Sequence, residues 1–199
     1  MASSFVVQPS DRRQFLINAT AAAGAACAAA TVYPLLASMA PSEAAKSAGA
    51  PVEADIAHLR AGELLTIGWR GKPTWILHRS PDMIAALNGH DDLLADPNSH
   101  DSQQPANCAN PGRSQRPEVF VCLGVCTHLG CSPTLRVDAD ARAQLGESWP
   151  GGFLCPCHGS KFDLAGRVFK GVPAPINLEV PPYRYLSDSR LLIGDDQPA

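Results

Sequence analysis

The sequence predicts a mainly β protein with a single transmembrane helix at its N-terminus. Residues 15–39 carry no charged side chain, and beyond residue 51 short apolar runs of strand length alternate with turn residues. The 18 prolines and 16 glycines suit a loop-rich β fold better than a helical bundle. A net charge of -3 gives no basic surface, so we expect no nucleic-acid partner.

The N-terminal segment is long enough to anchor the chain in a membrane. The uncharged run exceeds the ~20 residues that a helix needs to cross a bilayer, and we expect an anchor helix over residues 15–40. Arg12 and Arg13 precede this run and, with the apolar pair that follows Gln14, resemble a twin-arginine export signal. Positive charge before the span predicts a cytoplasmic segment 1–14 and a periplasmic remainder, at a bacterial inner membrane.

A cleaved signal peptide is the alternative to a retained anchor. Small residues at positions 48–50 could be cut. The apolar run is longer than the core of a typical signal peptide, however, which favours retention. Residues 41–51, rich in alanine, serine and proline, predict a flexible linker. The rest of the chain, residues 52–199, is then expected to form one domain on the periplasmic side.

The soluble domain is expected to consist mainly of short strands. A hairpin over residues 63–79 is predicted to turn at Gly71-Lys72, and a short helix to begin after the N-cap Ser80. Residues 90–117 are polar with little periodicity and predict a long excursion on the surface. Further strands are expected at residues 118–125, from Phe153, and at 167–169, 177–180, 183–187 and 190–193.

Two short motifs concentrate residues of the kinds that bind metals. The first is Cys126-Thr127-His128-Leu129-Gly130-Cys131, and the second is Cys155-Pro156-Cys157-His158-Gly159-Ser160. Each brings one cysteine and one histidine within three positions, adds a second cysteine, and contains a glycine or proline that permits a tight turn. The odd total of seven cysteines argues for metal or redox chemistry before a disulfide framework. From the residues alone, a structural zinc site with two cysteines and two histidines is the alternative.

The two motifs resemble the cluster-binding boxes of the Rieske iron–sulfur proteins. The resemblance implies a Rieske-type antiparallel β-sandwich or barrel with one [2Fe–2S] cluster, in a cluster-binding subdomain over about residues 122–176. The site residues that it implies are the ligands of one iron, Cys126 and Cys155, the ligands of the other, His128 and His158, the disulfide pair Cys131 and Cys157, and Ser160, which donates a hydrogen bond to a cluster sulfide. The two extra cysteines and Ser160 disfavour zinc, since a periplasmic setting permits a disulfide.

Mixed ligation by cysteine and histidine has a chemical consequence. Two neutral imidazoles in place of two thiolates make the oxidised centre neutral, so it accepts an electron at a potential roughly several hundred millivolts above that of all-cysteine ferredoxins. Reduction also raises the pKa of a ligated histidine, which couples electron uptake to proton uptake. An oxidant of quinol needs both properties, because quinol releases electrons and protons together.

Other segments resemble the respiratory members of this family. Residues 171–175, with Pro173 at their centre, resemble the proline loop that covers the cluster. Residues 69–76 and 102–105 resemble the first hairpin and the beginning of an insertion. Together with the anchor, these segments resemble the iron–sulfur subunits of bacterial cytochrome bc1 complexes, the ubiquinol–cytochrome c reductases.

The resemblance implies a subunit of a quinol–cytochrome c reductase that is active only within a dimeric complex. Quinol bound in cytochrome b would pass one electron to the cluster and one proton to a cluster histidine, His158. The head domain would then swing on its linker and deliver the electron to cytochrome c1. Leu129 would help to dock the head on cytochrome b, or else would only pack over the cluster. The alternative is a small Rieske subunit of a periplasmic oxidase such as arsenite oxidase.

Phe162 departs from the pattern of the family. High-potential members carry a tyrosine four positions after the second histidine ligand, and its hydroxyl donates a hydrogen bond to a ligand sulfur. Because hydrogen bonds to cluster sulfurs stabilise the reduced form, Phe162 predicts a lower reduction potential than in relatives with tyrosine, unless it only packs. Cys27, Cys108 and Cys122 lie outside the motifs, and Cys122 is expected to be a buried thiol.

Overall fold

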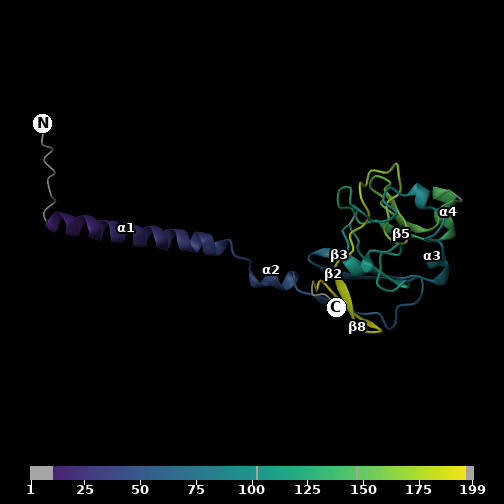
Figure 1. The fold of residues 1–199 in the computed structure, drawn as a ribbon, viewed down its shortest axis with the longest axis horizontal. Coiled ribbons are helices and arrows are strands. Elements are labelled where there is room, and N and C mark those ends of the chain that lie inside the picture. Colours follow the sequence, from purple (N-terminus) through teal and green to yellow (C-terminus); the bar gives the residue numbers. More distant parts are fainter. Residues whose placement is uncertain (1–10, 102, 147, 196–199) are drawn as a thin grey trace. The chain divides into compact units, whose positions relative to one another are not determined.

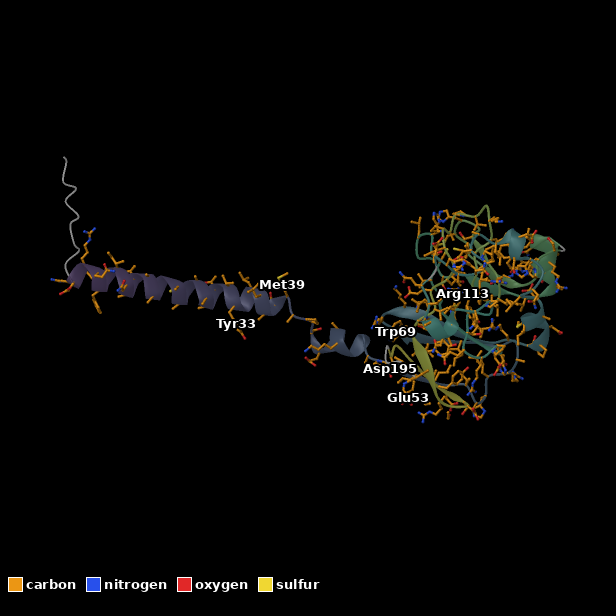
Figure 2. All side chains as sticks on the ribbon, in the orientation of Figure 1. Tyr33, Met39, Glu53, Trp69, Arg113 and Asp195 are labelled. Carbon is orange, nitrogen blue, oxygen red and sulfur yellow. A yellow bond between two sulfur atoms is a disulfide. The ribbon has the colours of Figure 1, made fainter. Side chains whose placement is uncertain are left out.

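The computed structural model describes residues 11–101, 103–146 and 148–195 (Figure 1). The chain divides into two compact units, with the division after Lys46. The first contains helix α1 (Asp11–Ser38), which among the described residues is the one helix long and apolar enough to cross a membrane. No residue of α1 is buried, and Figure 2 shows the Tyr33 side chain projecting from the helix, with Met39 just after its end.

Helix α1 satisfies its own polar side chains. The Thr20 hydroxyl donates to the Leu16 carbonyl at 2.8 Å, and the Thr31 hydroxyl donates to the Cys27 carbonyl at 2.9 Å. A membrane interior offers no water to do this, so internal bonds of this kind suit a spanning helix. At about 1.5 Å per residue, the 28 residues of α1 extend about 42 Å, more than the hydrocarbon core requires.

The segment expected to be a linker contains a short helix, α2 (Glu43–Ala48). The Ser42 hydroxyl accepts the Ala45 N–H at 3.1 Å, and Lys46 pairs with Glu43 at 2.6 Å on the exposed surface. A six-residue helix held by one cap and one exposed ion pair is marginal in water. Unwinding α2 therefore costs little free energy.

The second unit, the head, contains three antiparallel sheets of three strands each, which confirms the mainly β prediction (Figure 1). One sheet has the order β1 (Val52–Asp55), β9 (Arg190–Ile193), β8 (Tyr183–Ser187). The next has the order β2 (Leu64–Trp69), β3 (Lys72–His78), β4 (Val119–Leu123). The last has the order β5 (Thr134–Arg136), β6 (Gly152–Leu154), β7 (Lys161–Phe162) and carries the second motif between β6 and β7.

The predicted hairpin forms, with its turn one residue earlier than expected. Strands β2 and β3 pair antiparallel up to Trp69 opposite Lys72, so the two turn residues are Arg70 and Gly71. Both have positive φ, +49° and +71°, which is the conformation of a two-residue hairpin turn. The helix predicted next is α3 (Pro81–Ala85), and the Ser80 hydroxyl caps it by accepting the Met83 N–H.

Packing between two sheets positions the first motif. Every residue of β4 is buried, and the chain leaves this strand directly into the first motif. Trp75 of β3 stacks on Phe153 of β6, with ring centroids 5.1 Å apart. Gly124 lies against the same indole, where a Cβ atom would overlap with the Trp75 ring. Only glycine fits at this close approach, so the start of the first motif is fixed against the core.

The segment 90–117 is more than a surface excursion. It contributes two 3₁₀ turns, η1 (Asp91–Leu93) and η2 (Ala106–Cys108), and several buried side chains. Those exposed by less than a tenth are His90, Leu94, Ser99, Cys108, Arg113 and Ser114. The prediction of a surface excursion holds for most of the segment but missed these side chains, whose polar members are buried with partners far away in the sequence.

Two predicted strands are absent from the described residues, and helix α4, like α2, was not foreseen. Residues 167–169 make isolated bridges, Phe162 to Val168 and Leu94 to Phe169, instead of a strand. Residues 177–180 are largely buried but form no strand, and the Asn177 side chain accepts the Val168 N–H at 2.7 Å. Helix α4 (Ala139–Leu145) follows β5, capped by the Asp138 carboxylate on the Ala141 N–H.

Candidate metal centre

The first motif closes on itself through two backbone hydrogen bonds. The Cys126 N–H donates to the Cys131 carbonyl at 2.7 Å, and the Gly130 N–H donates to the Cys126 carbonyl at 3.0 Å. Gly130 has φ +85°, which a residue with a Cβ adopts only with strain. The result is a tight six-residue loop with His128 near its tip.

The second motif repeats this design. The Cys155 N–H donates to the Ser160 carbonyl at 2.8 Å, and the Gly159 N–H donates to the Cys155 carbonyl at 3.0 Å, with Gly159 at φ +75°. In both loops the first residue is a cysteine and the fifth is a glycine in the left-handed region. The sequence therefore encodes one loop geometry twice, with the histidine at the third position in one loop and the fourth in the other.

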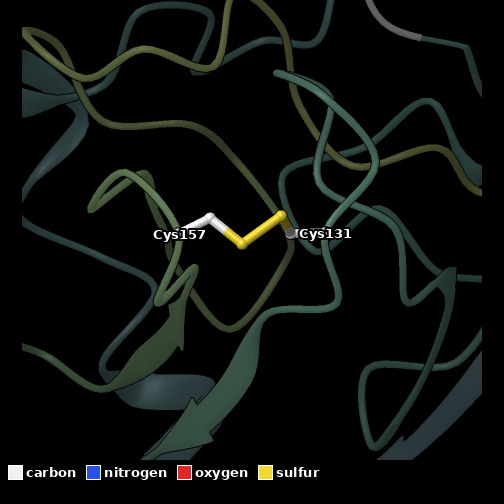
Figure 3. Close-up of a disulfide and its surroundings, with 2 residues drawn as sticks. All are labelled: Cys131 and Cys157. Atoms are coloured by element: carbon white, nitrogen blue, oxygen red, sulfur yellow. A yellow bond between two sulfur atoms is a disulfide. The ribbon is translucent and has the colours of Figure 1, made fainter.

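A disulfide joins the two loops (Figure 3). It links Cys131 with Cys157, whose Cα atoms are 6.7 Å apart, as the family resemblance implied. The bridge closes a loop with a sequence separation of 26, which in the chain-entropy model stabilises the folded state by about 3.5 kcal/mol. It also keeps the loops at a fixed spacing, so that side chains from both can meet.

The four predicted iron ligands form two pairs, each with one member from either loop. The thiols of Cys126 and Cys155 are buried and lie within hydrogen-bonding reach of each other. The rings of His128 and His158 are 4.8 Å apart between centroids and nearly perpendicular, at 88°. His128 is half-buried and His158 is exposed, so two sulfurs lie inside and two imidazoles at the rim. Two buried thiols and two imidazoles are a donor set that would fit a [2Fe–2S] cluster.

Local hydrogen bonds favour the thiolate that such a ligand needs. Burial raises the pKa of the Cys126 thiol, while hydrogen bonds from the His128 backbone N–H and the Ser160 hydroxyl act in the opposite direction. Ser160 is fully buried, and its oxygen accepts the Ala174 N–H at 3.0 Å, which leaves its own proton for a sulfur. A metal ion would displace the thiol proton outright.

A second grouping of sulfurs does not compete as a metal site. The Sγ atoms of Cys131, Cys155 and Cys157 all lie within 4.8 Å of one another. Two of these atoms are already bonded to each other, however, and a disulfide sulfur is not a thiolate ligand. Only Cys155 of this group is free to hold iron.

The segment 171–175 and the residue after it are hydrogen-bonded to both loops, and one of these bonds was not foreseen. Ala174 is bonded to Ser160 of the second loop. In the first loop the Thr127 hydroxyl donates to the Ile176 carbonyl at 2.6 Å. Pro173 itself is exposed. Thr127 stood in the motif, but nothing local in the sequence pointed to its partner 49 residues away.

Leu129 lies at the open end of the site. Its side chain is 73% exposed, the largest value among the large apolar residues described in the head. It stands between His128 and Gly130, and His158 of the other loop is exposed as well. The first loop therefore presents an exposed apolar side chain next to His128.

Phe162 and the remaining cysteines are not among the predicted ligands. Phe162 is fully buried in β7, opposite Phe153 of β6. Cys108 and Cys122 are buried free thiols, and Cys27 is a free thiol on α1. Burial raises the pKa of Cys122 to about 12, so this thiol stays protonated and unreactive at neutral pH.

Comparison with known proteins gives two matching family models and many relatives. Residues 7–42 match "Ubiquitinol-cytochrome C reductase Fe-S subunit TAT signal", and residues 112–183 match "Rieske [2Fe-2S] domain". The ubiquinol–cytochrome c reductase iron–sulfur subunit of Allochromatium vinosum is 55% identical over 186 residues, 94% of this chain and 89% of the relative. That of Blastochloris viridis is 42% identical over 195 residues, 98% of each chain. A chain of the solved "Hyperthermophilic respiratory Complex III" is 26% identical with a TM-score of 0.45, covering 87% of this chain and 96% of that one.

Proposed function

This chain belongs to the family of ubiquinol–cytochrome c reductase iron–sulfur subunits, and from that premise we propose that it takes one electron and a coupled proton from quinol and passes the electron to cytochrome c1. The observation that carries the proposal is the pair of buried thiols and the pair of facing imidazoles between the disulfide-linked loops. The relatives match over nearly the whole chain, anchor included, which favours this function over that of a periplasmic oxidase such as arsenite oxidase.

The domain is a Rieske [2Fe–2S] domain, and its family binds one [2Fe–2S] cluster. Cys126 and Cys155 would hold one iron, and His128 and His158 the other. When bound, the cluster accepts one electron at a potential above that of all-thiolate clusters. A structural zinc ion has no support from these comparisons. The two buried thiols, the Ser160 hydroxyl and the backbone N–H of His128 supply the environment that the group requires.

His158 is the residue that meets quinol. Its imidazole is exposed at the tip, where it accepts a hydrogen bond from a quinol hydroxyl and then the proton of that hydroxyl. Leu129 provides the apolar contact with cytochrome b that holds the tip over the quinol site. The segment 171–175, held through Ser160 and through the bond from Thr127 to the adjacent Ile176, would cover the cluster and limit the access of water.

The membrane arrangement completes the proposal. Residues 1–14 stay in the cytoplasm, α1 anchors the chain within 15–40, and the head, residues 52–199, lies in the periplasm with its cluster-binding subdomain over about 122–176. Residues 41–51 let the head move between cytochrome b and cytochrome c1 in a dimeric complex. The marginal stability of α2 supports this, because a short exposed helix unwinds at little cost.

Electron paramagnetic resonance on dithionite-reduced membranes tests the function. A signal of low average g-value is expected from mixed cysteine and histidine ligation, and its line shape should change when an inhibitor occupies the quinol site. The His158→Gln variant should lose the signal and the quinol–cytochrome c reductase activity. The matched variant His100→Gln, at an exposed histidine far from either motif in sequence, should keep both. A wild-type signal that ignores the inhibitor would place the cluster elsewhere than at a quinol site.

A further inference from the structure

Three arginine side chains lie inside the head. Arg79, Arg113 and Arg167 are each exposed by 1% or less, and Figure 2 labels Arg113 within the head. Moving a guanidinium out of water has a large cost in free energy unless hydrogen bonds and charges compensate for it. The partners of these three side chains therefore indicate why a small domain keeps them.

The hydrogen bonds of Arg79 and Arg113 end on neighbouring carbonyls of one turn. Arg79 Nη1 donates to the Leu164 carbonyl at 3.4 Å, and Arg113 Nη1 donates to the Ala165 and Gly166 carbonyls at 3.2 and 3.3 Å. Gly166 allows this close packing, since a Cβ there would lie 2.9 Å from Phe120 Cζ and 3.3 Å from Arg113 Nη1. Two cations from distant parts of the chain thus hold the same few peptide groups.

Arg167 belongs to the same turn but is neutralised within it. Its Nε donates to Asp163 Oδ2 at 2.7 Å, and Asp163 Oδ1 accepts the backbone N–H groups of Ala165 and Arg167. His90 approaches the same carboxylate at 3.3 Å, and Asp91 at the rim accepts a second bond from Arg167. Asp163 and Arg167 form a compact ion pair. Although burial alone would raise the pKa of the Asp163 carboxyl, its contacts with His90 and Arg167 hold that pKa below its usual value.

Arg79 and Arg113 find mainly neutral acceptors. Besides the turn, Arg79 donates to the Gly112 carbonyl and the Ser114 hydroxyl and lies 5.3 Å from the centre of the Phe120 ring. Arg113 donates to the side-chain carbonyl of Gln104. Asp163 attracts both, and Asp96 attracts Arg113, at longer range.

Both side chains stay charged in this environment. Burial lowers the pKa of each to about 10, which still leaves both guanidinium groups protonated at neutral pH. Among the described residues, the fully buried part of the head therefore carries three guanidinium groups and one carboxylate, Asp163. The excess charge inside the head is positive.

This positive charge lies close to the second loop. The turn of residues 163–167 begins three residues after Ser160, so Asp163 is at most ~11 Å from Ser160 along an extended chain. We propose that Arg79 and Arg113 raise the reduction potential of the bound cluster, because their buried positive charges, hydrogen-bonded directly only to neutral acceptors, favour the negative charge that the cluster gains on reduction. The inference rests on the proposed function, since it needs a redox cluster between the loops.

The size of the effect follows from Coulomb's law. One charge about 15 Å away, at an effective dielectric constant of about 20, changes the ratio of reduced to oxidised cluster by about sixfold at a fixed ambient potential. At 59 mV per tenfold change for one electron, sixfold is about 46 mV. A change of this size is easily resolved in a redox titration.

The experiment compares three substitutions in the full-length chain within its native membranes, titrated potentiometrically with the cluster signal in electron paramagnetic resonance as readout. Arg79→Gln removes a buried positive charge. It should lower the midpoint potential, so that the ratio of reduced to oxidised cluster at a fixed ambient potential falls about sixfold. Asp163→Asn removes the buried negative charge and should raise the midpoint. Arg116→Gln is the matched control, because Arg116 is partly exposed and pairs with the exposed Asp188, and it should leave the midpoint unchanged.

Midpoint shifts of opposite sign for the two buried substitutions support the proposal. Loosened packing alone would not give a shift whose sign depends on the charge removed. Equal signs, or an unchanged midpoint with a wild-type line shape, would overturn it. If Arg79→Gln fails to bind a cluster, Arg113→Gln takes its place and Asp163→Asn alone still decides by its sign. A wild-type chain without any cluster signal would instead refute the proposed function, so the two failures are distinguishable.

Discussion

Restoring a tyrosine at position 162 is expected to raise the reduction potential. Phe162 is fully buried in β7, two residues after Ser160, and pairs with Phe153 across the sheet. Phe162→Tyr adds one hydroxyl at a place without access to water. That hydroxyl must find an acceptor in the protein or remain unpaired, which costs about 1–3 kcal/mol. If the acceptor is a cluster sulfur, as the family resemblance implies, the bond strengthens when the cluster becomes more negative.

The expected shift can be estimated from the strength of such a bond. A hydrogen bond to a charged acceptor exceeds one to a neutral acceptor by about 1 kcal/mol or somewhat more. For one electron, about 1.4 kcal/mol corresponds to a tenfold ratio and 59 mV. We therefore expect Phe162→Tyr to raise the midpoint by about 50 mV and to leave the melting temperature near that of the wild type.

Film voltammetry on the purified protein, combined with thermal melting, gives both quantities. Phe169→Tyr is the matched control, because Phe169 is half-buried, stacks on the His90 ring at 5.9 Å, and offers a new hydroxyl a route to solvent. It should change neither value. An unchanged midpoint together with a lower melting temperature in Phe162→Tyr would mean that the hydroxyl lies unpaired and that Phe162 only packs, which would refute the reasoning.

Three further predictions concern the loops and the linker. Cys157→Ala removes the disulfide to Cys131 and should lower the free energy of unfolding of the head by about 3.5 kcal/mol. Denaturant titration measures this loss, and a reduced wild-type sample should show the same loss. Thr127→Val removes the hydrogen bond to the Ile176 carbonyl and should lower the free energy of unfolding by about 1–2 kcal/mol. Thr66→Val, at an exposed strand position, should lower it little. Equal losses would contradict a role of the Thr127 hydroxyl in holding this segment. Several prolines placed within residues 41–51 should slow turnover with cytochrome c while the cluster signal persists, and undiminished turnover would contradict the swinging step.

Much of the fold could be predicted from local sequence patterns. The bounds of β8 and β9 agree with the predicted strands residue for residue, and the capped helix after Ser80 forms where the hydroxyl and the following proline place it. These elements depend on neighbours within a few positions, so a short stretch of sequence contains their cause. The same holds for the two motifs, whose spacing alone brings each cysteine near its histidine.

Long-range partners explain what the sequence could not reveal. Nothing near Arg113 indicates that it will be buried, because its acceptors at Ala165 and Gly166 lie more than 50 residues away. The segment around Asn177 has the composition of a strand, yet it forms none, and the Asn177 side chain accepts a hydrogen bond from the Val168 N–H. From the sequence, polar residues are predicted to lie on the surface. Only the folded chain shows which of them find enough hydrogen-bond partners to be buried.

The two influences on the potential should add if they act independently. Phe162→Tyr supplies a donor to a sulfur, whereas Arg79→Gln removes charge behind the second loop, and effects without shared partners usually combine additively. An increase of about 50 mV and a decrease of about 46 mV should then leave the midpoint of the double variant close to that of the wild type, although each single variant departs from it. Redox titration of all four proteins in one buffer measures the coupling directly. A double variant that follows one single variant instead of the sum would mean that both residues act through the same contact, the placement of the second loop, and charge would no longer be the explanation for Arg79.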